Sequence, residues 1–328
     1  MRVGTLALTA ALVAAGAGTA RAQQQVNATR STGSTGRVEI HNPSGSIHVI
    51  GWGQNQVQVT GTLGSSSERL VLEDDDAGLE VRVQRPGGHG SNRGGSLTIR
   101  VPRRKDVEIV SMSGSVTVEG MDGTVEATSH SGGVRVSGGR SRTIMATSRS
   151  GSVDVDADAE RVEATSLSGS VTVAGTVRDR VEATSLSGGV RITAQAGQVE
   201  AGSTSGTVEI ASMRGRAEVH SVSGDVRVTG RGLSGSFQTV SGSVILTGDL
   251  DRDADLELNS HSGNVVLQLS SGASADIDAG TFSGSIDVDY PGARVERESR
   301  RSARIRLGSG DATVKMQTFS GSVKLVRR

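Results

Sequence analysis

Ser166-Leu167-Ser168-Gly169-Ser170-Val171-Thr172-Val173 is an octapeptide that returns, nearly unchanged, as Ser185-Leu186-Ser187-Gly188-Gly189-Val190-Arg191-Ile192. Its Ser-Gly pair marks a repeat that runs through most of the 328-residue chain. In the regular part the glycines recur every 18 or 19 residues, at Gly114, Gly132, Gly151, Gly169, Gly188, Gly206, Gly224 and Gly242. Looser copies follow at Gly263, Gly284 and Gly321, after 21, 21 and 37 residues. A fixed period of this length is typical of a solenoid, in which each repeat is one coil resting on its neighbours.

Each repeat is predicted to hold two short strands joined at a corner. In residues 161–180, inward and outward positions alternate from Val162 to Ser166, which favours a strand. Gly169 then marks the corner, where glycine tolerates the positive φ that a sharp bend often needs. Val171 and Val173 flank a threonine, so both valines are expected to point inward from a second strand. The chain is therefore predicted to be an all-β, single-chain parallel β-solenoid with coils of 18–19 residues and a β cap at each end.

The outward positions of the predicted strands carry a column of glutamates. The column consists of Glu126, Glu163, Glu182, Glu200 and Glu218, and Met145 interrupts it. Arg161, Arg180 and Arg216 stand two residues before three of these glutamates and are expected on the same face. Alternating charges would offset the repulsion between stacked carboxylates. The column is interpreted as a solvated charged face, with a cation-binding stripe as the alternative.

Changes in the repeat divide the chain into five segments. The predicted segments are a signal peptide (1–22), a flexible linker (23–37), an N-terminal β cap with diverged repeats (38–110), the regular coils (111–290) and C-terminal coils with a cap (291–328). Within the N-terminal cap, the runs 70–72 and 79–83 are predicted to form a hairpin around the acidic residues 73–76. The caps are expected because the open end of a solenoid would otherwise expose unpaired strand edges.

The first 22 residues have the order of features found in a secretory signal peptide. Arg2 supplies a positive start, residues 6–17 form a short apolar run, and Ala20-Arg21-Ala22 has the small residues of a cleavage site. The apolar run is too short to anchor the chain across a bilayer. The protein is therefore expected to be exported, to the periplasm or to the cell surface.

Composition excludes several classes of function. The chain carries 35 basic and 35 acidic residues, and this balance gives no general attraction to nucleic acid. It has no cysteine, so no disulfide framework supports it. Aromatic residues make up only 2% of the chain, whereas 46 residues are glycine. A narrow core of Val, Ala, Ile and Ser is therefore expected in place of an ordinary globular core.

The recurring S-x-S-G-[SGTDN]-[VI]-x-[VIL] pattern resembles that of a bacterial family of secreted β-strand-repeat proteins. The family is of uncharacterised function and is often labelled "putative adhesins". The segments 47–52, 97–102 and 318–323 also look like this family, and the resemblance extends over residues 38–328. It implies a parallel β-solenoid of right-handed coils, exported to the cell envelope. The shared motif is structural, so no residue inherits a catalytic role from it.

No catalytic, cofactor-binding or metal site is predicted. The sequence has no G-x-S-x-G nucleophile elbow, no phosphate-binding loop and only three lysines. Its histidines are His41, His48, His89, His130, His220 and His261, and none is paired at zinc-ligand spacing. His130 and His261 both occupy the variable position of S-x-S-G, but they lie seven marked repeats apart and cannot share an ion.

Two sets of carboxylates leave an alternative open. Asp154, Asp156 and Asp158 alternate outward on one predicted strand, as do Asp287 and Asp289 on another. Two carboxylates about 5–10 Å apart can cleave a glycosidic bond, so a polysaccharide-active enzyme is one alternative and calcium binding is another. However, the regular coils carry no aromatic platform and no long insertion that would build a cleft. Solvated strand-face carboxylates are the preferred interpretation.

The C-terminal stretch 294–306 is rich in arginine. It contains Arg294, Arg297, Arg300, Arg301, Arg304 and Arg306. Only Glu296 and Glu298 oppose this charge, so the stretch is predicted either to be a solvated loop of the cap or to bind an anionic polymer.

These features favour a non-enzymatic, exported β-solenoid that acts as a structural, adhesive or protein-binding surface in the bacterial envelope. Its partner is expected to be an envelope polymer, a surface or a protein. The alternatives are a polysaccharide-active β-helix enzyme and an envelope-stress or regulatory sensor that binds another protein. Extended solenoid faces generally bind through shape and repeated contacts, which is why the first hypothesis leads.

Overall fold

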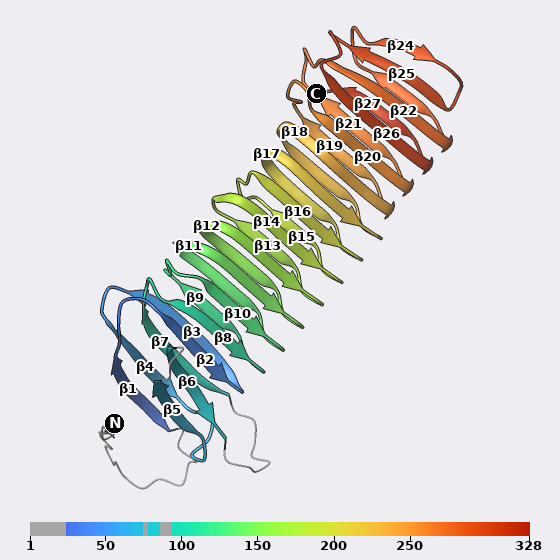
Figure 1. Cartoon of the computed structure of the whole chain (residues 1–328). Helices are drawn as coiled ribbons and strands as arrows, with labels where there is room; N and C mark the ends of the chain where they lie inside the picture. Colours follow the sequence, from blue (N-terminus) through green and yellow to red (C-terminus); the bar gives the residue numbers. More distant parts are fainter. Residues whose placement is uncertain (1–23, 75–77, 86–93) are drawn as a thin grey trace, which may run out of the picture.

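The protein is a rod of stacked β-strands (Figure 1). Its computed structural model describes residues 24–74, 78–85 and 94–328. Within these residues every regular element is a strand, and the 27 strands belong to one sheet in which most neighbours run parallel. The predicted all-β class and parallel pairing are therefore confirmed. The predicted signal peptide lies outside the described residues, and the right-handed sense of the coils stays a prediction.

Two columns of parallel strands run the length of the rod. The first column contains β8 (Asp106–Ser111), β10 (Val125–Ser129), β11 (Val134–Ser148), β12 (Val153–Ser166), β14 (Val177–Ser185), β16 (Gln198–Ser203), β17 (Val208–Ser221), β18 (Val226–Ser241) and β20 (Asp255–Ser262). The second contains β9 (Val116–Glu119), β13 (Val171–Ala174), β15 (Val190–Ile192), β19 (Val244–Gly248) and β21 (Val265–Leu269), together with the first halves of β11, β12, β17 and β18. One pass through both columns is called a coil below.

The strands stack in the register that the Ser-Gly period predicts. Val125 pairs with Ile144, Ile144 with Val162, and Val162 with Val181, so successive partners are 19, 18 and 19 residues apart. The inward side chains form a core of mainly valine and alanine; Val171 and Val173, for example, are fully buried as expected. Burying one valine side chain contributes about 1.5–3 kcal/mol before the entropy cost, and every coil repeats this contribution.

The corner of each coil is held by a buried hydroxyl. The hydroxyl of Ser185 donates to the carbonyl of Gly169 in the preceding coil, at 2.8 Å, and accepts from the backbone N–H of Gly188, at 2.9 Å. Six serines repeat this pair of bonds: Ser129, Ser148, Ser166, Ser185, Ser203 and Ser221. The first serine of S-x-S-G is therefore a cross-link between coils, a role that its polarity alone did not indicate.

Glycine is needed at the corner for a different reason from the one predicted. Among the regular corners only Gly114 has a positive φ, of 146°. At the corners from Gly132 to Gly242, a β-carbon would instead come within 3.0 Å of backbone atoms of the preceding coil. The prediction that the corner glycine supplies a positive φ is therefore wrong for these coils, since the close stacking of backbone on backbone is what excludes a side chain.

Replacing Ser185 by alanine should destabilise the coils around it by about 1–3 kcal/mol, because a buried carbonyl and a buried N–H would both lose their partner. Hydrogen exchange of residues 181–203 would measure this local loss. Ser187→Ala is the matched control, since Ser187 is exposed and its hydroxyl makes no hydrogen bond in the structure. Ser185→Thr should keep most of the protection, because Thr239 makes the same bond to its preceding coil. If Ser185→Ala and Ser187→Ala lost hydrogen-exchange protection to the same extent, the proposed cross-link would be contradicted.

At the N-terminal end, chain order and spatial order differ. The coil of β2 (Arg37–Asn42) and β3 (Gly45–Trp52) lies between the coil of β8 and β9 and an outer coil of β6 (Gly78–Gln84) and β7 (Gly95–Pro102). Antiparallel strands then cover the outer coil. They are β5 (Arg69–Asp74) on β6, β4 (Gln56–Thr62) on β7, and β1 (Gln25–Ser31) on β4. The predicted hairpin is thus confirmed as β5–β6.

Strand β1 corrects one predicted boundary. Residues 23–37 were expected to be a flexible linker, but Gln25–Ser31 pairs with β4 along its whole length. Without β1, the backbone N–H and C=O groups on that edge of β4 would have no protein partner. Pairing with β4 therefore orders a segment whose polar composition suggested a linker.

The C-terminal end shows the same inversion of order. The last coil, β26 (Ala312–Ser320) and β27 (Val323–Arg327), lies between the coil of β20 and β21 and the coil of β22 (Ala275–Ser283) and β23 (Ile286–Asp289). Antiparallel β25 (Ser302–Leu307) covers β22, and β24 (Arg294–Arg297) covers β25. Residues 291–328 were predicted to end the rod, whereas residues 312–327 are inserted inside it. The stacking of the Ser-Gly corners explains this, because Gly321 packs on Gly263 and Gly284 packs on Gly321.

Candidate functional site

The variable residues of the S-x-S-G corners form a continuous exposed row, which we call the corner ridge. In spatial order its members are Met112, His130, Arg149, Leu167, Leu186, Thr204, Val222, Val240, His261, Phe319 and Phe282. Backbone hydrogen bonds keep neighbouring corners together; the N–H groups of Leu167 and Leu186, for example, each donate to the preceding coil at 3.1 Å. Seven of the eleven members are large apolar residues that remain exposed, and Leu186 and Phe282 are 51% and 59% accessible.

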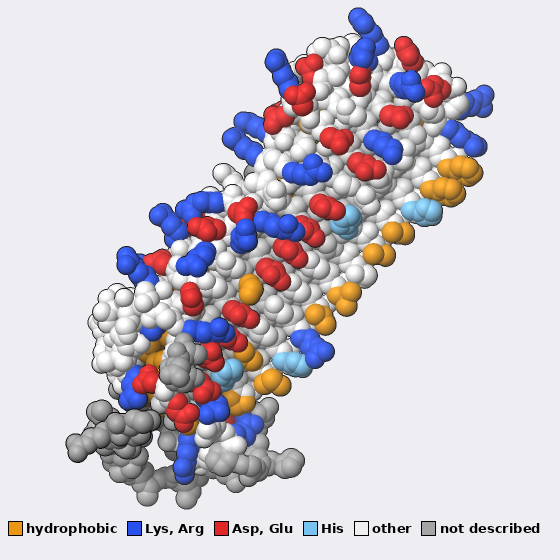
Figure 2. Space-filling model, in the orientation of Figure 1, with side chains coloured by type: hydrophobic (Ala, Val, Ile, Leu, Met, Phe, Trp, Pro, Cys, Tyr) orange, Lys and Arg blue, Asp and Glu red, His pale blue; other side chains and the backbone are white. Residues whose placement is uncertain are grey.

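The columns on both sides of the corner ridge carry almost no charge. On one side lie Thr128, Thr147, Thr165, Thr184, Gly202, His220, Gln238, Asn259 and Gln317. On the other side lie the second serines of the motif, from Ser131 to Ser283. Figure 2 shows the ridge as a line of orange side chains along one edge of the rod, while Lys, Arg, Asp and Glu gather on the neighbouring face. An apolar row with uncharged borders has the composition of the centre of a protein interface.

At its C-terminal end the corner ridge becomes a stack of rings. Phe319 lies between His261, with ring centroids 4.9 Å apart, and Phe282, with ring centroids 4.7 Å apart. The guanidinium of Arg301 covers the outer face of Phe282 at 5.5 Å from the ring centroid. The ring faces are therefore occupied by one another, and the stack presents ring edges outward. It is not the free aromatic platform on which a sugar ring would lie.

A shallow groove of about 760 Å³ lies beside the ring stack. Its lining includes Gln238, Asn259 and Gln317 opposite Phe282 and Phe319. The side-chain amide nitrogen of Asn259 donates to Glu257 at 2.9 Å, whereas its carbonyl oxygen is buried and lacks a donor. The groove runs along the corner ridge, so the surface here combines the apolar side chains of the ridge with the amide side chains of the bordering column.

The structure places the candidate histidines apart. His130 and His261 are both members of the corner ridge, near its opposite ends. His48 and His220 each contact a glutamate, at 3.1 Å, and His89 lies outside the described residues. Within the part of the chain that the structure describes, no group of three or more His, Asp or Glu side chains is placed to hold a metal ion.

The two aspartate sets lie in different parts of the rod (Figure 1). Asp154 is in the regular coils, where it pairs with Arg135 at 3.3 Å. Asp287 and Asp289 are on β23, which among the described strands pairs with β27 alone and so forms an edge of the sheet. Charged side chains on an edge strand hinder pairing with another sheet, which gives these two aspartates a structural role. The structure does not bring the two sets together.

The glutamate column is present in the predicted register. Glu126 neighbours Met145, and the column continues without interruption from Glu163 to Glu218. It also extends toward the N-terminus through Glu108, Glu39 and Glu80, which the looser N-terminal spacing had hidden. Arg180 contacts Glu182 at 3.8 Å and also pairs with Glu200. Arg161 instead pairs with Asp179, at 2.6 Å, so the predicted arginine–glutamate lattice forms only in part.

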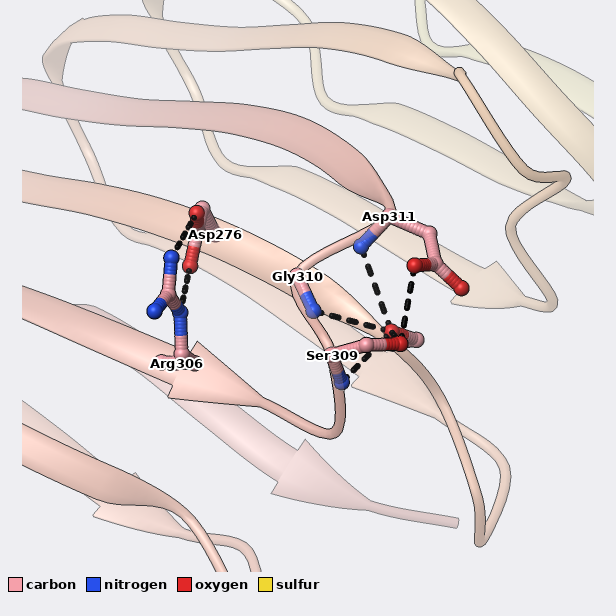
Figure 3. A network of polar contacts seen from close by, with 6 residues as sticks. Asp276, Arg306, Ser309, Gly310 and Asp311 are labelled. Carbon is pink, nitrogen blue, oxygen red and sulfur yellow. Dashed lines mark hydrogen bonds and ion pairs between the residues drawn. The ribbon is translucent and has the colours of Figure 1, made fainter.

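The arginine-rich stretch folds as the hairpin β24–β25, and several of its side chains are engaged within the cap. Arg306 makes two hydrogen bonds to Asp276, at 2.7 and 2.8 Å (Figure 3). Arg304 contacts Glu298 at 3.2 Å, and Arg297 donates to a carbonyl of the edge strand β23. Beside the Arg306 pair, the hydroxyl oxygen of Ser274 accepts from three successive backbone N–H groups, those of residues 309–311. These contacts bind the hairpin and the following turn to β22.

The Arg306–Asp276 pair should make the cap sensitive to acid. The hydrogen bond from Arg306 holds the pKa of Asp276 below its ordinary value of 3.8. A carboxyl with a lowered folded pKa contributes stability above its unfolded pKa, and this stability is lost as the pH falls through the folded value. Hydrogen exchange of β25 should therefore speed up, relative to the intrinsic rate, when the pH drops below about 3.8. Asp276→Asn should weaken the protection at neutral pH and flatten its pH dependence, whereas Asp287→Asn should leave that dependence unchanged.

A sequence model described as Toastrack DUF4097 matches residues 35–251 and 216–326, which overlap and together run from just before β2 into β27. The chain belongs to the Toastrack DUF4097 family. This agrees with the resemblance drawn from the S-x-S-G corners. The chain has no significant match among curated proteins.

Three solved structures resemble this Toastrack chain at low identity. One, from Parabacteroides distasonis, is described as a "putative lipid binding protein"; it is 14% identical, with 68% of this chain and 96% of that chain covered and a TM-score of 0.47. A "putative cell adhesion protein" from Clostridium sporogenes is 10% identical, with 93% and 100% covered and a TM-score of 0.22. A "putative adhesin" from Bacteroides fragilis is 10% identical, with 93% and 99% covered and a TM-score of 0.35. At these identities and TM-scores the likenesses carry no functional conclusion.

Proposed function

We propose that this Toastrack chain is a non-enzymatic, exported binding rod of the bacterial envelope, a structural, adhesive or protein-binding surface whose contacts are made through the corner ridge. The observation that carries the proposal is the row of exposed apolar side chains with uncharged borders. Isolated apolar residues are common on protein surfaces, but a contiguous apolar patch rimmed by polar residues marks an interaction site. Here an exposed apolar residue occupies the corner position in seven of the eleven coils of the ridge.

The repeat supports binding because it multiplies a weak contact. Each coil offers only one side chain at the corner, and a single exposed Leu or Val contributes little. Stacking places neighbouring corners about 4.8 Å apart, so a partner lying along the rod would meet many of them at once. The charged face beside the ridge keeps the rod hydrated, and within the ridge itself Arg149 is the one Lys, Arg, Asp or Glu among the eleven members.

Export is the second element of the proposal, and it rests on the signal-like residues 1–22. Among residues 24–74, 78–85 and 94–328 there is no helix that is long and apolar enough to cross a membrane. The proposal places the rod in the periplasm or on the cell surface. An epitope-tagged copy in intact cells should be cut by added protease if it is on the surface, and only after the outer membrane is opened if it is periplasmic. Protection until the cytoplasm is released would refute export.

Site-directed crosslinking in intact cells tests the ridge itself. The chain contains no cysteine, so a single thiol can be introduced at Leu186 without competing reactions. A thiol-directed crosslinker should then join the ridge to a protein partner in good yield. Thr172→Cys is the matched control, because Thr172 lies outward on the second column of the neighbouring coil, away from the ridge. A ridge thiol that yields no more adduct than the control would refute the proposed binding surface.

A further inference from the structure

The order of residues along the corner ridge is close to a palindrome. Thr204 is the sixth of the eleven members and therefore the central one. On either side of it lie two apolar residues, Leu186 and Leu167 toward the N-terminal end and Val222 and Val240 toward the C-terminal end. The next member in each direction is polar, Arg149 on one side and His261 on the other, and the two ends are again apolar, with Met112 and Phe282. Only the pair formed by His130 and Phe319 differs in polarity.

We propose that the corner ridge binds the corner ridge of a second copy of this chain, with the two rods antiparallel about a two-fold axis at Thr204. A two-fold interface must be self-complementary, since each position faces its counterpart counted from the other end. In this arrangement Leu186 faces Val222 and Leu167 faces Val240, so apolar meets apolar on both sides of the axis. The inference rests on the proposed function, for which it names the partner.

Charge selects the antiparallel arrangement over the parallel one. In a parallel pair every ridge residue would face its own copy, so the two Arg149 guanidinium groups would meet in the interface. Like charges brought together at an interface are strongly unfavourable. In the antiparallel pair Arg149 faces the imidazole of His261, beside the ring of Phe319. The antiparallel pairing therefore separates the two Arg149 guanidinium groups, and Phe319, whose faces are covered by His261 and Phe282, presents only its ring edge there.

The size of the surface predicts a modest affinity. Ten steps of about 4.8 Å make the ridge about 48 Å long, and the ridge with its two bordering columns is about 10 Å wide along the strands. A strip of roughly 500 Å² on each copy lies near the lower limit for a specific interface. We therefore expect a dimer that forms at micromolar concentrations and dissociates on dilution.

Disulfide crosslinking at chosen ridge positions tests both the pairing and its register. A mixture of Leu167→Cys and Val240→Cys proteins should form a mixed disulfide in high yield under mild oxidation, because the two positions face each other. Leu167→Cys alone should not link, because its own copies would be four steps, about 19 Å, apart and a disulfide needs α-carbons within about 7 Å. Thr172→Cys, off the ridge, measures random collision. Rapid linkage of Leu167→Cys to itself would show parallel pairing and overturn the proposal.

Sedimentation equilibrium of the cysteine-free protein supplies an independent readout. The unmodified chain should shift from monomer to dimer with concentration, and Leu186→Glu should weaken the association at least 10-fold, because it places a charge beside Val222 of the second copy. Circular dichroism would verify that this exposed substitution leaves the strands intact. A monomer up to about 100 µM would overturn the proposal. If a ridge thiol in cells nevertheless links to a different protein, the proposed binding function survives and only the homotypic partner is wrong.

Discussion

Replacing Gly206 by alanine should destabilise the rod by about 1–3 kcal/mol or more, although it adds only one methyl group. The new β-carbon would lie within 3.0 Å of the carbonyl of Gly188 and of the next peptide nitrogen in the preceding coil. Both obstacles are backbone atoms, so no side chain can rotate away. The two coils would have to separate, and the hydroxyl bond from Ser203 to Gly188 would lengthen with them. Thermal unfolding and hydrogen exchange of residues 185–210 would measure the effect.

Gly202 offers a control within the same coil. A β-carbon there would have its nearest neighbour at 3.7 Å, which is ordinary contact. The strand neighbour of Gly202 in the preceding coil is Thr184, so the structure already accepts a side chain in this column. Gly202→Ala should therefore leave the melting temperature unchanged or raise it slightly, since alanine restricts the unfolded chain. If Gly202→Ala and Gly206→Ala lowered the melting temperature by similar amounts, the close contact between neighbouring coils could not be the reason why glycine is needed at the corner.

Removing residues 312–328 should have the largest effect on the C-terminal end. This deletion takes out β26 and β27, which are the direct neighbours of β20 and β21 on one side and of β22 and β23 on the other. Besides the buried Ala312, four larger buried side chains are lost, and each contributes about 1.5–3 kcal/mol of burial: Val314, Met316, Val323 and Leu325. We expect residues 275–307 to detach from the rod, to be cut in limited proteolysis, and to leave β20 and β21 as an aggregation-prone parallel edge.

Deletion of residues 24–31 is the comparison for this truncation. It removes β1, an outermost strand whose one neighbour in the part of the chain that the structure describes is β4. Its loss should raise protease sensitivity only near β4 and should leave the regular coils intact. If the C-terminal truncation were equally mild, and residues 275–289 stayed protected, then the last coil could not be holding the cap to the rod.

The sequence predicts the structure correctly where the repeat determines which residues of successive coils are neighbours. In the regular coils the 18- or 19-residue period predicts that Glu163 neighbours Glu182, and two-residue alternation predicts that Val171 and Val173 point inward; both predictions are confirmed. Prediction from the sequence fails where the period breaks. The spacing from Gly263 to Gly284 to Gly321 suggests three corners in that order, yet Gly321 stacks between the other two. A spacing longer than one coil does not say which coil the returning strand will join.

The corner ridge was hidden for a related reason. The variable position of S-x-S-G holds Met, His, Arg, Leu, Thr, Val and Phe, so it shows no conserved chemistry from repeat to repeat within the chain. Its meaning appears only when the corners are stacked, because exposed residues 18 to 58 positions apart then become neighbours. The buried hydroxyl of Ser185 was missed in the same way, since its partner carbonyl belongs to the preceding coil.

The local pattern of this chain, with its Ser-Gly period, its alternating valines and its scarcity of aromatic residues, was sufficient to specify an all-β protein of parallel, stacked strands. That pattern acts over a few residues at a time, through backbone geometry and the burial of alternate side chains. The order of the coils at both ends, the closeness of backbone to backbone at the corners, and the continuous exposed ridge all depend on contacts between distant segments. Such contacts are settled by which edges remain open for pairing once the coils have stacked, and the folded rod alone reveals them.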